Sequence, residues 1–199
     1  MAKEPAAETR SRILEQSMPL FAAAGYDGVS MRAVAAQTRL TTAALYYHFP
    51  DKEQLYLELI RYAIFERMMP HMALEGGSSG WAELERFVRA TVQVFTRDTD
   101  LQRLMQWVML DRDDARAQAL TDNVLAPFYD RLLSLVEGMG PVMDSHFLVT
   151  AIFSLIVFPL ESRHARRLLP GYQSPLENPE RLASQILQLL KGGLSGEPE

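Results

Sequence analysis

The chain has 199 residues, of which 48% are hydrophobic, and its formal net charge is −5. This apolar fraction excludes a disordered chain and supports one large domain or two small ones. The absence of cysteine excludes a disulfide framework and a thiolate metal site, and it suits a reducing, cytoplasmic compartment.

The N-terminal segment, MAKEPAAETRSR, is polar and lacks the apolar region of a signal peptide. From Thr9 to Ala24 apolar side chains recur at helical spacing, which predicts a first helix. Pro19 removes one backbone hydrogen bond of this helix, so we expect a kink or a helix end there. Gly25 is placed to stop the helix, and Asp27-Gly28 predicts the following turn.

Residues 30–52 predict two short helices joined by a tight turn at Thr38–Leu40. Ser30 and Thr41 directly precede the two helices, and each hydroxyl can accept a hydrogen bond from an unpaired N–H of the first turn. Pro50 ends the second helix, because a proline ring and its missing N–H do not fit a helix interior.

The second of these helices has two different faces. At 3.6 residues per turn, Leu45 and Phe49 share one side. The opposite side presents small and aromatic side chains, namely Thr42, Ala43, Tyr46 and Tyr47. A short helix with this bulky apolar back suits the major groove of DNA. Helix pairs of this kind also occur in many other helical proteins, where such tyrosines are packing residues.

Helical patterning continues to the C-terminus. We expect six further helices, over residues 52–69, 82–97, 101–110, 114–137, 144–169 and 180–190. Pro70 ends the first of them and Pro127 bends the fourth. The glycine- and serine-rich segment at residues 76–80 predicts a flexible connector.

Residues 147–160 form the longest apolar run, which is too short to span a bilayer. A helix that is apolar on nearly all sides must be buried, and one small domain offers few partners for every side.

Residues 25–55 resemble the helix-turn-helix of tetracycline-repressor-type (TetR family) transcriptional regulators. The similarity lies in the run Leu45-Tyr46-Tyr47-His48-Phe49, in Lys52-Glu53 and Leu55 after it, and in Gly25-Tyr26 and Ser30-Met31-Arg32 before it. The C-terminal part carries no comparable signature.

The resemblance implies an all-α fold of about nine helices. An N-terminal three-helix helix-turn-helix DNA-binding domain would occupy residues 1–50, and a C-terminal helical ligand-binding and dimerisation domain residues 51–199. It also implies that the last two long helices pair with their copies across a twofold axis, which would bury residues 147–160. The alternative is a monomeric bundle with this helix at its centre.

The resemblance further assigns DNA contacts to nine residues: Ser30, Arg32, Thr41, Thr42, Ala43, Tyr46, Tyr47, His48 and Lys52. Most of these contacts position the protein on the backbone rather than read the sequence. This chain departs from the family pattern at Arg39 and Ala43, where glycine is common, and at Thr42, where lysine is common. The departure at Arg39 costs about 1 kcal/mol if the turn needs a positive φ. Residues 1–50 carry five basic and four acidic side chains, a small positive balance within the acidic total.

The C-terminal part offers aromatic side chains for a small, lipophilic effector. The predicted ligand-binding residues are Tyr62, Glu66, Thr91, Phe95, Trp107, Phe128, Tyr129 and Phe153. Most aromatic residues at helical spacing are ordinary core residues rather than ligand contacts. Glu66 indicates a cationic effector only if its side chain faces a cavity. Gln106, Asn123 and His146 are further polar candidates.

No catalytic residue, metal site or cofactor is predicted. The four histidines stand singly on different helices, and Glu66 and Glu161 form no carboxylate pair. The segment at residues 76–80 lacks the lysine and the preceding strand of a phosphate-binding loop.

The sequence therefore predicts a cytoplasmic, homodimeric transcriptional regulator, a repressor that releases a near-palindromic double-stranded DNA operator when an effector binds. One alternative is a DNA-binding protein of the same fold controlled by a protein partner instead of a small molecule. The other is a helical adaptor that does not bind DNA.

Overall fold

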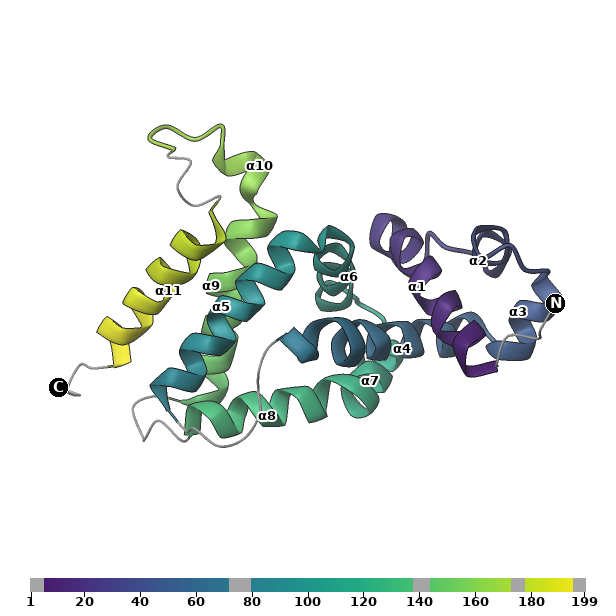
Figure 1. Cartoon of the computed structure of the whole chain (residues 1–199), viewed down its shortest axis with the longest axis horizontal. Helices are drawn as coiled ribbons and strands as arrows, with labels where there is room; N and C mark the ends of the chain where they lie inside the picture. Colours follow the sequence, from purple (N-terminus) through teal and green to yellow (C-terminus); the bar gives the residue numbers. More distant parts are fainter. Residues whose placement is uncertain (1–5, 72–79, 138–143, 173–177, 195–199) are drawn as a thin grey trace. The chain divides into compact units, whose positions relative to one another are not determined.

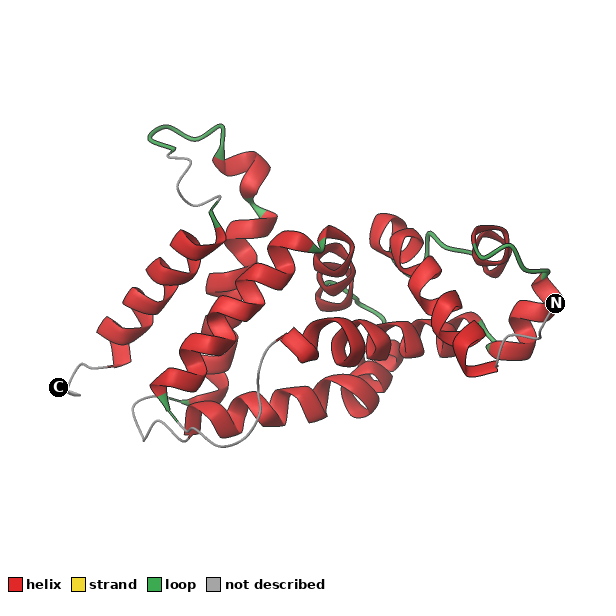
Figure 2. Ribbon diagram, in the orientation of Figure 1, coloured by secondary structure: helices red, strands yellow, loops and turns green. Residues whose placement is uncertain are grey.

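The computed structural model describes residues 6–71, 80–137, 144–172 and 178–194. All regular structure in these ranges is helical (Figure 2), and none of these helices is long and apolar enough to cross a membrane. The chain packs as two compact units, which interleave along the sequence: unit 1 is Met1–Arg67 with Asp98–Ala126, and unit 2 is Met68–Arg97 with Pro127–Glu199. The predicted domain boundary after residue 50 stays a prediction.

Unit 1 contains the N-terminal helices and the middle of the chain (Figure 1). Its α-helices are α1 (Ala6–Ala24), α2 (Met31–Gln37), α3 (Thr42–His48), α4 (Lys52–Tyr62), α6 (Thr99–Met109) and α7 (Asp114–Leu120). Helix α1 packs against α6 and α4 and also contacts α2. The fully buried side chains of Ile13 and Phe21 anchor α1 in this core. Helix α1 therefore packs against the first helix of the helix-turn-helix and against α4 and α6.

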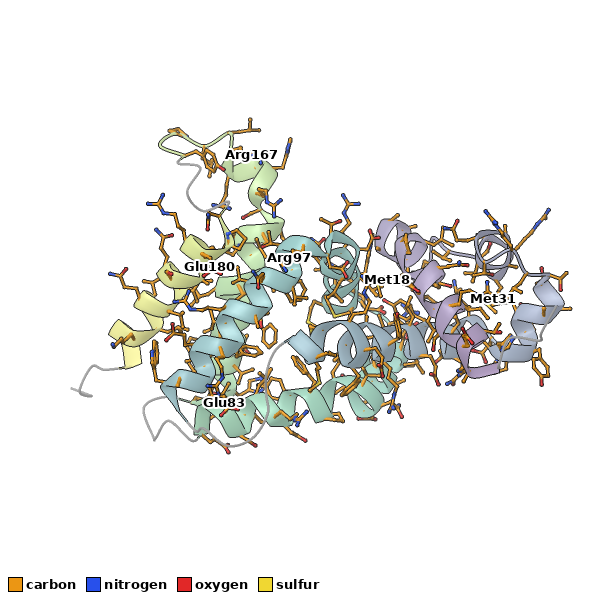
Figure 3. The ribbon with its side chains drawn as sticks, in the orientation of Figure 1. Met18, Met31, Glu83, Arg97, Arg167 and Glu180 are labelled. Carbon is orange, nitrogen blue, oxygen red and sulfur yellow. The ribbon has the colours of Figure 1, made fainter. Side chains whose placement is uncertain are left out.

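Unit 2 is built on α5 (Trp81–Arg97), which packs against α9 (Ser145–Glu161) and α11 (Pro179–Leu194). Its other elements are the 3-10 turn η2 (Met69–His71), α8 (Ala126–Glu137) and α10 (Arg163–Arg166). The buried side of α5 consists of Leu84, Phe87, Val88, Thr91, Val92 and Phe95. On the surface, Arg89 of α5 pairs with Glu180 of α11 at 3.2 Å. Glu180 stands near the start of α11 (Figure 3).

Of the two outcomes expected at Pro19, the helix end is wrong, because α1 continues through Pro19 to Ala24, and the kink stays a prediction. Pro19 lies on the exposed side of the helix, as does Glu15, whose carbonyl loses its partner there. Water can pair with a carbonyl on that side. Ile13 and Phe21, which flank the proline, are fully buried, and this packing holds both halves of the helix in place.

Two predicted single helices are interrupted by π-helical segments. Residues 63–68 form η1 (Ala63–Met68) after α4, and residues 121–125 form η3 (Thr121–Leu125) between α7 and α8. Each segment ends shortly before a proline, Pro70 or Pro127, whose missing N–H and bulky ring disfavour a regular α-turn. The carbonyl of Asn123, four residues before Pro127, accepts a hydrogen bond from Arg61 Nη2 at 3.3 Å instead.

The helix predicted over residues 144–169 ends at Glu161, and α10 follows it. Its apolar run is not buried on every side within the chain, since Phe147 is 59% and Phe158 65% exposed. In α11 Leu187 is buried, whereas Leu189 is exposed. Of the predicted connector at residues 76–80, all but Gly80 lies outside the described residues.

Candidate nucleic-acid interface

The first helix of the predicted pair is capped and half-buried. Ser30 Oγ accepts a hydrogen bond from the N–H of Ala33 at 3.2 Å, as the sequence predicts. The inward side of α2 carries Met31 (Figure 3) and Val34, which are buried. Ser30 and Arg32 remain exposed, where a DNA strand can reach them.

The turn between α2 and α3 adopts a backbone that favours glycine. The N–H of Leu40 donates to the Ala35 carbonyl at 2.9 Å, and the N–H of Arg39 donates to the Ala36 carbonyl at 3.2 Å. These two bonds form a Schellman motif, whose left-handed position is usually glycine. Arg39 occupies that position with φ of 56°. The turn therefore needs a positive φ, and an L-residue there costs about 1 kcal/mol.

The start of α3 presents three exposed side chains. Thr41 caps the helix, its Oγ1 accepting from the N–H of Ala44 at 3.1 Å. Thr41, Thr42 and Ala43 are all exposed. None of the three is charged, so this turn offers a hydroxyl donor and a methyl group to a base edge.

The two faces of α3 are as the sequence predicts. Leu45 and Phe49 are completely buried, whereas Tyr46 is 47% and Tyr47 82% exposed. The Tyr47 ring meets the His48 ring edge to face, with centroids 5.4 Å apart. The tyrosines are therefore not core residues of this chain.

Arg10 fixes the last turn of α3. Its Nη1 donates to the His48 carbonyl at 2.5 Å, and its Nη2 pairs with Glu58 Oε1 of α4 at 3.0 Å. The guanidinium carbon also lies 4.2 Å from the centre of the Phe49 ring. Because the last carbonyls of a helix lack intrahelical partners, Arg10 supplies a donor and joins α1, α3 and α4.

Lys52 is engaged inside unit 1. Its Nζ donates to the carbonyls of Tyr26 and Val29, both at 3.1 Å, and lies 4.0 Å from the centre of the Tyr26 ring. An ammonium group has three N–H donors, and these contacts with two carbonyls and a ring engage Lys52 within the fold. The role of Lys52 in DNA binding stays a prediction, while its role in holding α4 against the loop after α1 is observed.

A second cation lies over the same ring. The guanidinium carbon of Arg116 is 4.1 Å from the centre of the Tyr26 ring. Arg116 in turn forms a two-bond ion pair with Asp111, at 2.5 Å and 2.7 Å, and the two side chains are only 10% and 7% exposed. We call Tyr26, Lys52, Asp111 and Arg116 the Tyr26 cluster.

The charges of the Tyr26 cluster stabilise one another. The hydrogen bonds from Arg116 hold the pKa of Asp111 below its ordinary value, and the same bonds raise the pKa of Arg116. Burial raises the pKa of Tyr26, so the phenol stays neutral between its cationic neighbours. The cluster joins the loop after α1, the start of α4 and the α6–α7 segment, all within unit 1.

The predicted ligand-binding residues do not all lie in one unit. Tyr62, Glu66 and Trp107 belong to unit 1, and the other five belong to unit 2. Glu66 is exposed, so its carboxylate gives no information about an effector. Trp107 Nε1 donates to the Ala22 carbonyl at 3.1 Å, which ties α6 to the end of α1.

The remaining candidates have partners within unit 2. Thr91 is buried, and its hydroxyl donates to the Phe87 carbonyl at 2.7 Å, so it is not free to bind a ligand as a donor. Phe95 is likewise buried. The Tyr129 hydroxyl is 2.6 Å from His146 Nδ1.

A small apolar cavity lies inside unit 2. Its lining comes from α5, α8 and α9 and consists of Leu84, Phe87, Leu132, Leu135, Val136, Val149, Ile152 and Phe153. Phe128 packs against the Phe153 ring at 6.0 Å between centroids. The space has a volume of about 10 Å³, comparable to one water molecule. Of the predicted ligand residues, only Phe153 lines it, because the sequence gives aliphatic residues no mark that separates lining from core.

Four side chains that hold this region together were not identified from the sequence: Arg10, Tyr26, Asp111 and Arg116. Arg10 appeared only as one of the N-terminal basic residues, and Tyr26 only as part of a motif. Their partners are distant along the chain, so no local spacing could have revealed them.

The fold and this interface define an all-helical protein with a helix-turn-helix near its N-terminus. Residues 13–59 match the family model described as bacterial regulatory proteins, tetR family. This N-terminal region of the chain is therefore of the TetR-family type.

Curated relatives match mainly in this N-terminal region. The transcriptional regulator AcrR of Shigella flexneri is 37% identical over 57 residues, which cover 29% of this chain and 26% of AcrR. The transcriptional repressor KstR of Rhodococcus jostii is 29% identical over 127 residues, 64% of this chain and 58% of KstR. This chain thus covers about a quarter to just over half of the length of these relatives.

A solved structure extends the likeness to the whole fold. The regulator FadR from Bacillus subtilis in complex with stearoyl-CoA superposes with a TM-score of 0.72, over 94% of this chain and 98% of FadR. The sequences are 14% identical, so this comparison shows the fold alone.

Proposed function

We propose that this chain is a homodimeric, DNA-binding transcriptional regulator, which acts as a repressor and releases its operator when a small lipophilic effector binds. The observation that carries the proposal is the exposure of α3. Its apolar side is completely buried, and its tyrosine side faces solvent on a helix capped and anchored at both ends.

In the proposed complex α3 enters the major groove. Thr42 and Ala43 lie at base edges, where a hydroxyl donates and a methyl group contacts thymine. Tyr46, Tyr47 and His48 contact the sugar-phosphate backbone, and Ser30 and Arg32 contact the flanking strand. One such helix reads a short half-site, so tight binding requires two copies in grooves about 34–36 Å apart.

The second copy docks on α9 and α11. Phe147 and Phe158 of α9 and Leu189 of α11 are exposed, although they lie on helices whose other faces are core. A self-complementary apolar surface of this kind is typical of a twofold dimer. The monomeric alternative would leave these side chains in water.

The effector site lies at the apolar cavity of unit 2. Its lining is entirely hydrocarbon, which suits an acyl chain, and FadR from Bacillus subtilis was solved with stearoyl-CoA. The cavity must widen to admit such a chain, because drug-sized sites occupy about 300–1,000 Å³. By linkage, the effector and the operator weaken each other by the same factor.

A second candidate is regulation by a protein partner. The small volume of the described cavity favours it, since no space for a ligand is open there. The two candidates differ in one measurement. Stearoyl-CoA releases bound operator in the first case and has no effect on it in the second.

The test of DNA binding is selection of bound duplexes from a random pool by the full chain. We expect a near-palindromic site of two half-sites. Tyr47→Ala should then weaken binding by about tenfold or more, since two contacts are lost per dimer. Met109→Ala, an exposed side chain at the end of α6, is the matched control and should leave binding unchanged. A pool without any enriched sequence would contradict the proposal.

A further inference from the structure

We propose that Arg39, in the turn between α2 and α3, contacts a DNA phosphate and supplies the positive charge that Thr42 does not. This inference rests on the proposed DNA-binding function. It adds a contact that the resemblance does not assign, because the family usually has glycine at this position of the turn.

The first observation is backbone strain. Arg39 has φ of 56°, the left-handed region that L-residues rarely adopt. The turn is otherwise complete, because Thr38 Oγ1 donates to the Val34 carbonyl at 2.9 Å and the Schellman bonds are formed. Glycine would make the same turn without strain. A strained residue that the turn does not need is expected where its side chain has a use.

The second observation is which cations near the helix-turn-helix remain available. Arg10 is paired with Glu58 and the His48 carbonyl, and Lys52 with two carbonyls. Arg12 Nη1 lies 3.5 Å from the Thr38 carbonyl. The cations of α1 and the start of α4 therefore already serve the fold.

Arg32 and Arg39 differ from those three. Both are exposed, and neither has an ion pair or a side-chain hydrogen bond to any residue that the structure describes. Binding to DNA draws its salt-dependent affinity from cations that neutralise phosphates. Among the described residues of the helix-turn-helix, Arg32 and Arg39 are therefore the arginines placed to neutralise phosphates.

The third observation is position. Arg39 stands two residues before Thr41, the cap of α3, and three before Thr42, where the family often has lysine. Its guanidinium carries five donors in a planar fork that fits two phosphate oxygens, on a long side chain that can reach past the turn. The positive charge of Arg39 therefore lies before the start of α3, close to the position where the family often has lysine.

The test compares Arg39→Gly with the unchanged chain on the selected operator. The midpoint of thermal unfolding should rise by about 2 °C, because the strain is removed. Operator affinity at 0.1 M salt should fall by about ten- to a hundredfold for the dimer, and the slope of log K against log salt should lose about 2 units. A purely structural residue would not gain stability while losing affinity.

Two further variants separate charge from strain. Arg39→Ala keeps the strain and removes the charge, so it should lose affinity and slope without gaining stability. Arg39→Lys keeps the charge and should retain the slope.

Unchanged affinity and slope in Arg39→Gly, on an operator that the unchanged chain binds, would overturn the inference and leave the proposed function standing. Loss of slope in Arg39→Lys equal to that in Arg39→Ala would also overturn it. If the unchanged chain selects no DNA, the proposed function itself fails.

Discussion

Unit 1 and unit 2 have cores of different chemistry. In unit 1 cations lie over aromatic rings, with Arg10 over Phe49 at 4.2 Å, and Lys52 and Arg116 over Tyr26 at 4.0 Å and 4.1 Å. Each contact is worth about 0.5–2 kcal/mol, and more as water is excluded. These contacts have a direction, so they fix where short helices begin and end.

Rings contact rings in both units, as Tyr56 contacts Phe21 and Tyr26 in unit 1, and in unit 2 such contacts surround Phe153. The Phe153 ring contacts the rings of both Phe87 and Phe128, with centroids 6.0 Å apart in each case. The ion pairs of unit 2, such as that of Arg89 with Glu180, lie at its surface. Apolar packing of this kind is strong but has little direction, so it tolerates small shifts of one helix along another. The comparison indicates that directional contacts fix the core of unit 1, whereas the core of unit 2 can repack more easily.

The largest expected effect is loss of the buried ion pair in unit 1. Arg116→Ala should lower the free energy of unfolding by about 3–5 kcal/mol, because Asp111 is left buried and charged without its partner. Denaturant unfolding measures this loss. The matched control is Arg89→Ala in unit 2, whose exposed pairs with Glu85 and Glu180 should contribute less than about 1 kcal/mol. Equal losses in the two variants would remove the proposed difference between the units.

The next effect concerns the outer face of unit 2. Phe158→Asp should weaken dimerisation by about 2 kcal/mol or more per interface, since it puts a charge into an apolar contact. Sedimentation at micromolar concentration measures the change, and Met109→Asp in unit 1 is the control with a similarly exposed side chain. Sedimentation of the unchanged chain as a monomer would contradict the proposed dimer.

A smaller effect is expected at the caps of the helix-turn-helix. Thr41→Ala should cost about 1 kcal/mol of stability, because the N–H of Ala44 loses its acceptor. Thr41→Ser keeps the acceptor and should restore most of this loss. If the alanine and serine variants unfold at the same denaturant concentration, the cap seen at 3.1 Å contributes nothing measurable.

The smallest effect is a pH dependence confined to unit 1. Because the hydrogen bonds from Arg116 depress the pKa of Asp111 in the folded state, this carboxylate stabilises the fold above its ordinary pKa of 3.8. That contribution is lost as pH falls from 3.8 through the lower folded-state pKa. Acid unfolding of Asp111→Asn should lack this part of the slope, and an unchanged slope would show that other carboxylates control acid unfolding.

Most features of the candidate interface could be predicted from local signals in the sequence. The caps at Ser30 and Thr41, the buried pair Leu45 and Phe49, and the strained turn at Arg39 each depend on neighbours within a few residues. The helix pattern of α5 was predicted for the same reason, since a regular stripe of apolar residues needs no information about its partners.

The contacts that the sequence did not reveal are those between distant residues. Arg116 over Tyr26 depends on how α7 returns to the loop after α1, which no spacing encodes. The π-helical segments likewise depend on a distant donor for the carbonyl that proline leaves without an N–H partner. For the Asn123 carbonyl this donor is Arg61. The cavity was missed because residues lining a small apolar space are the same types that fill a core.

The contact of Trp107 with the end of α1 gives this protein an optical reporter. The indole donates to Ala22, and a methyl group added at Gly25 would lie 2.9 Å from its ring, so any separation of α6 from α1 changes the surroundings of the fluorophore. The chain has two tryptophans, so replacing Trp81 by phenylalanine leaves a single emitter. Its emission wavelength then follows rearrangement inside unit 1 during a titration, without any attached dye.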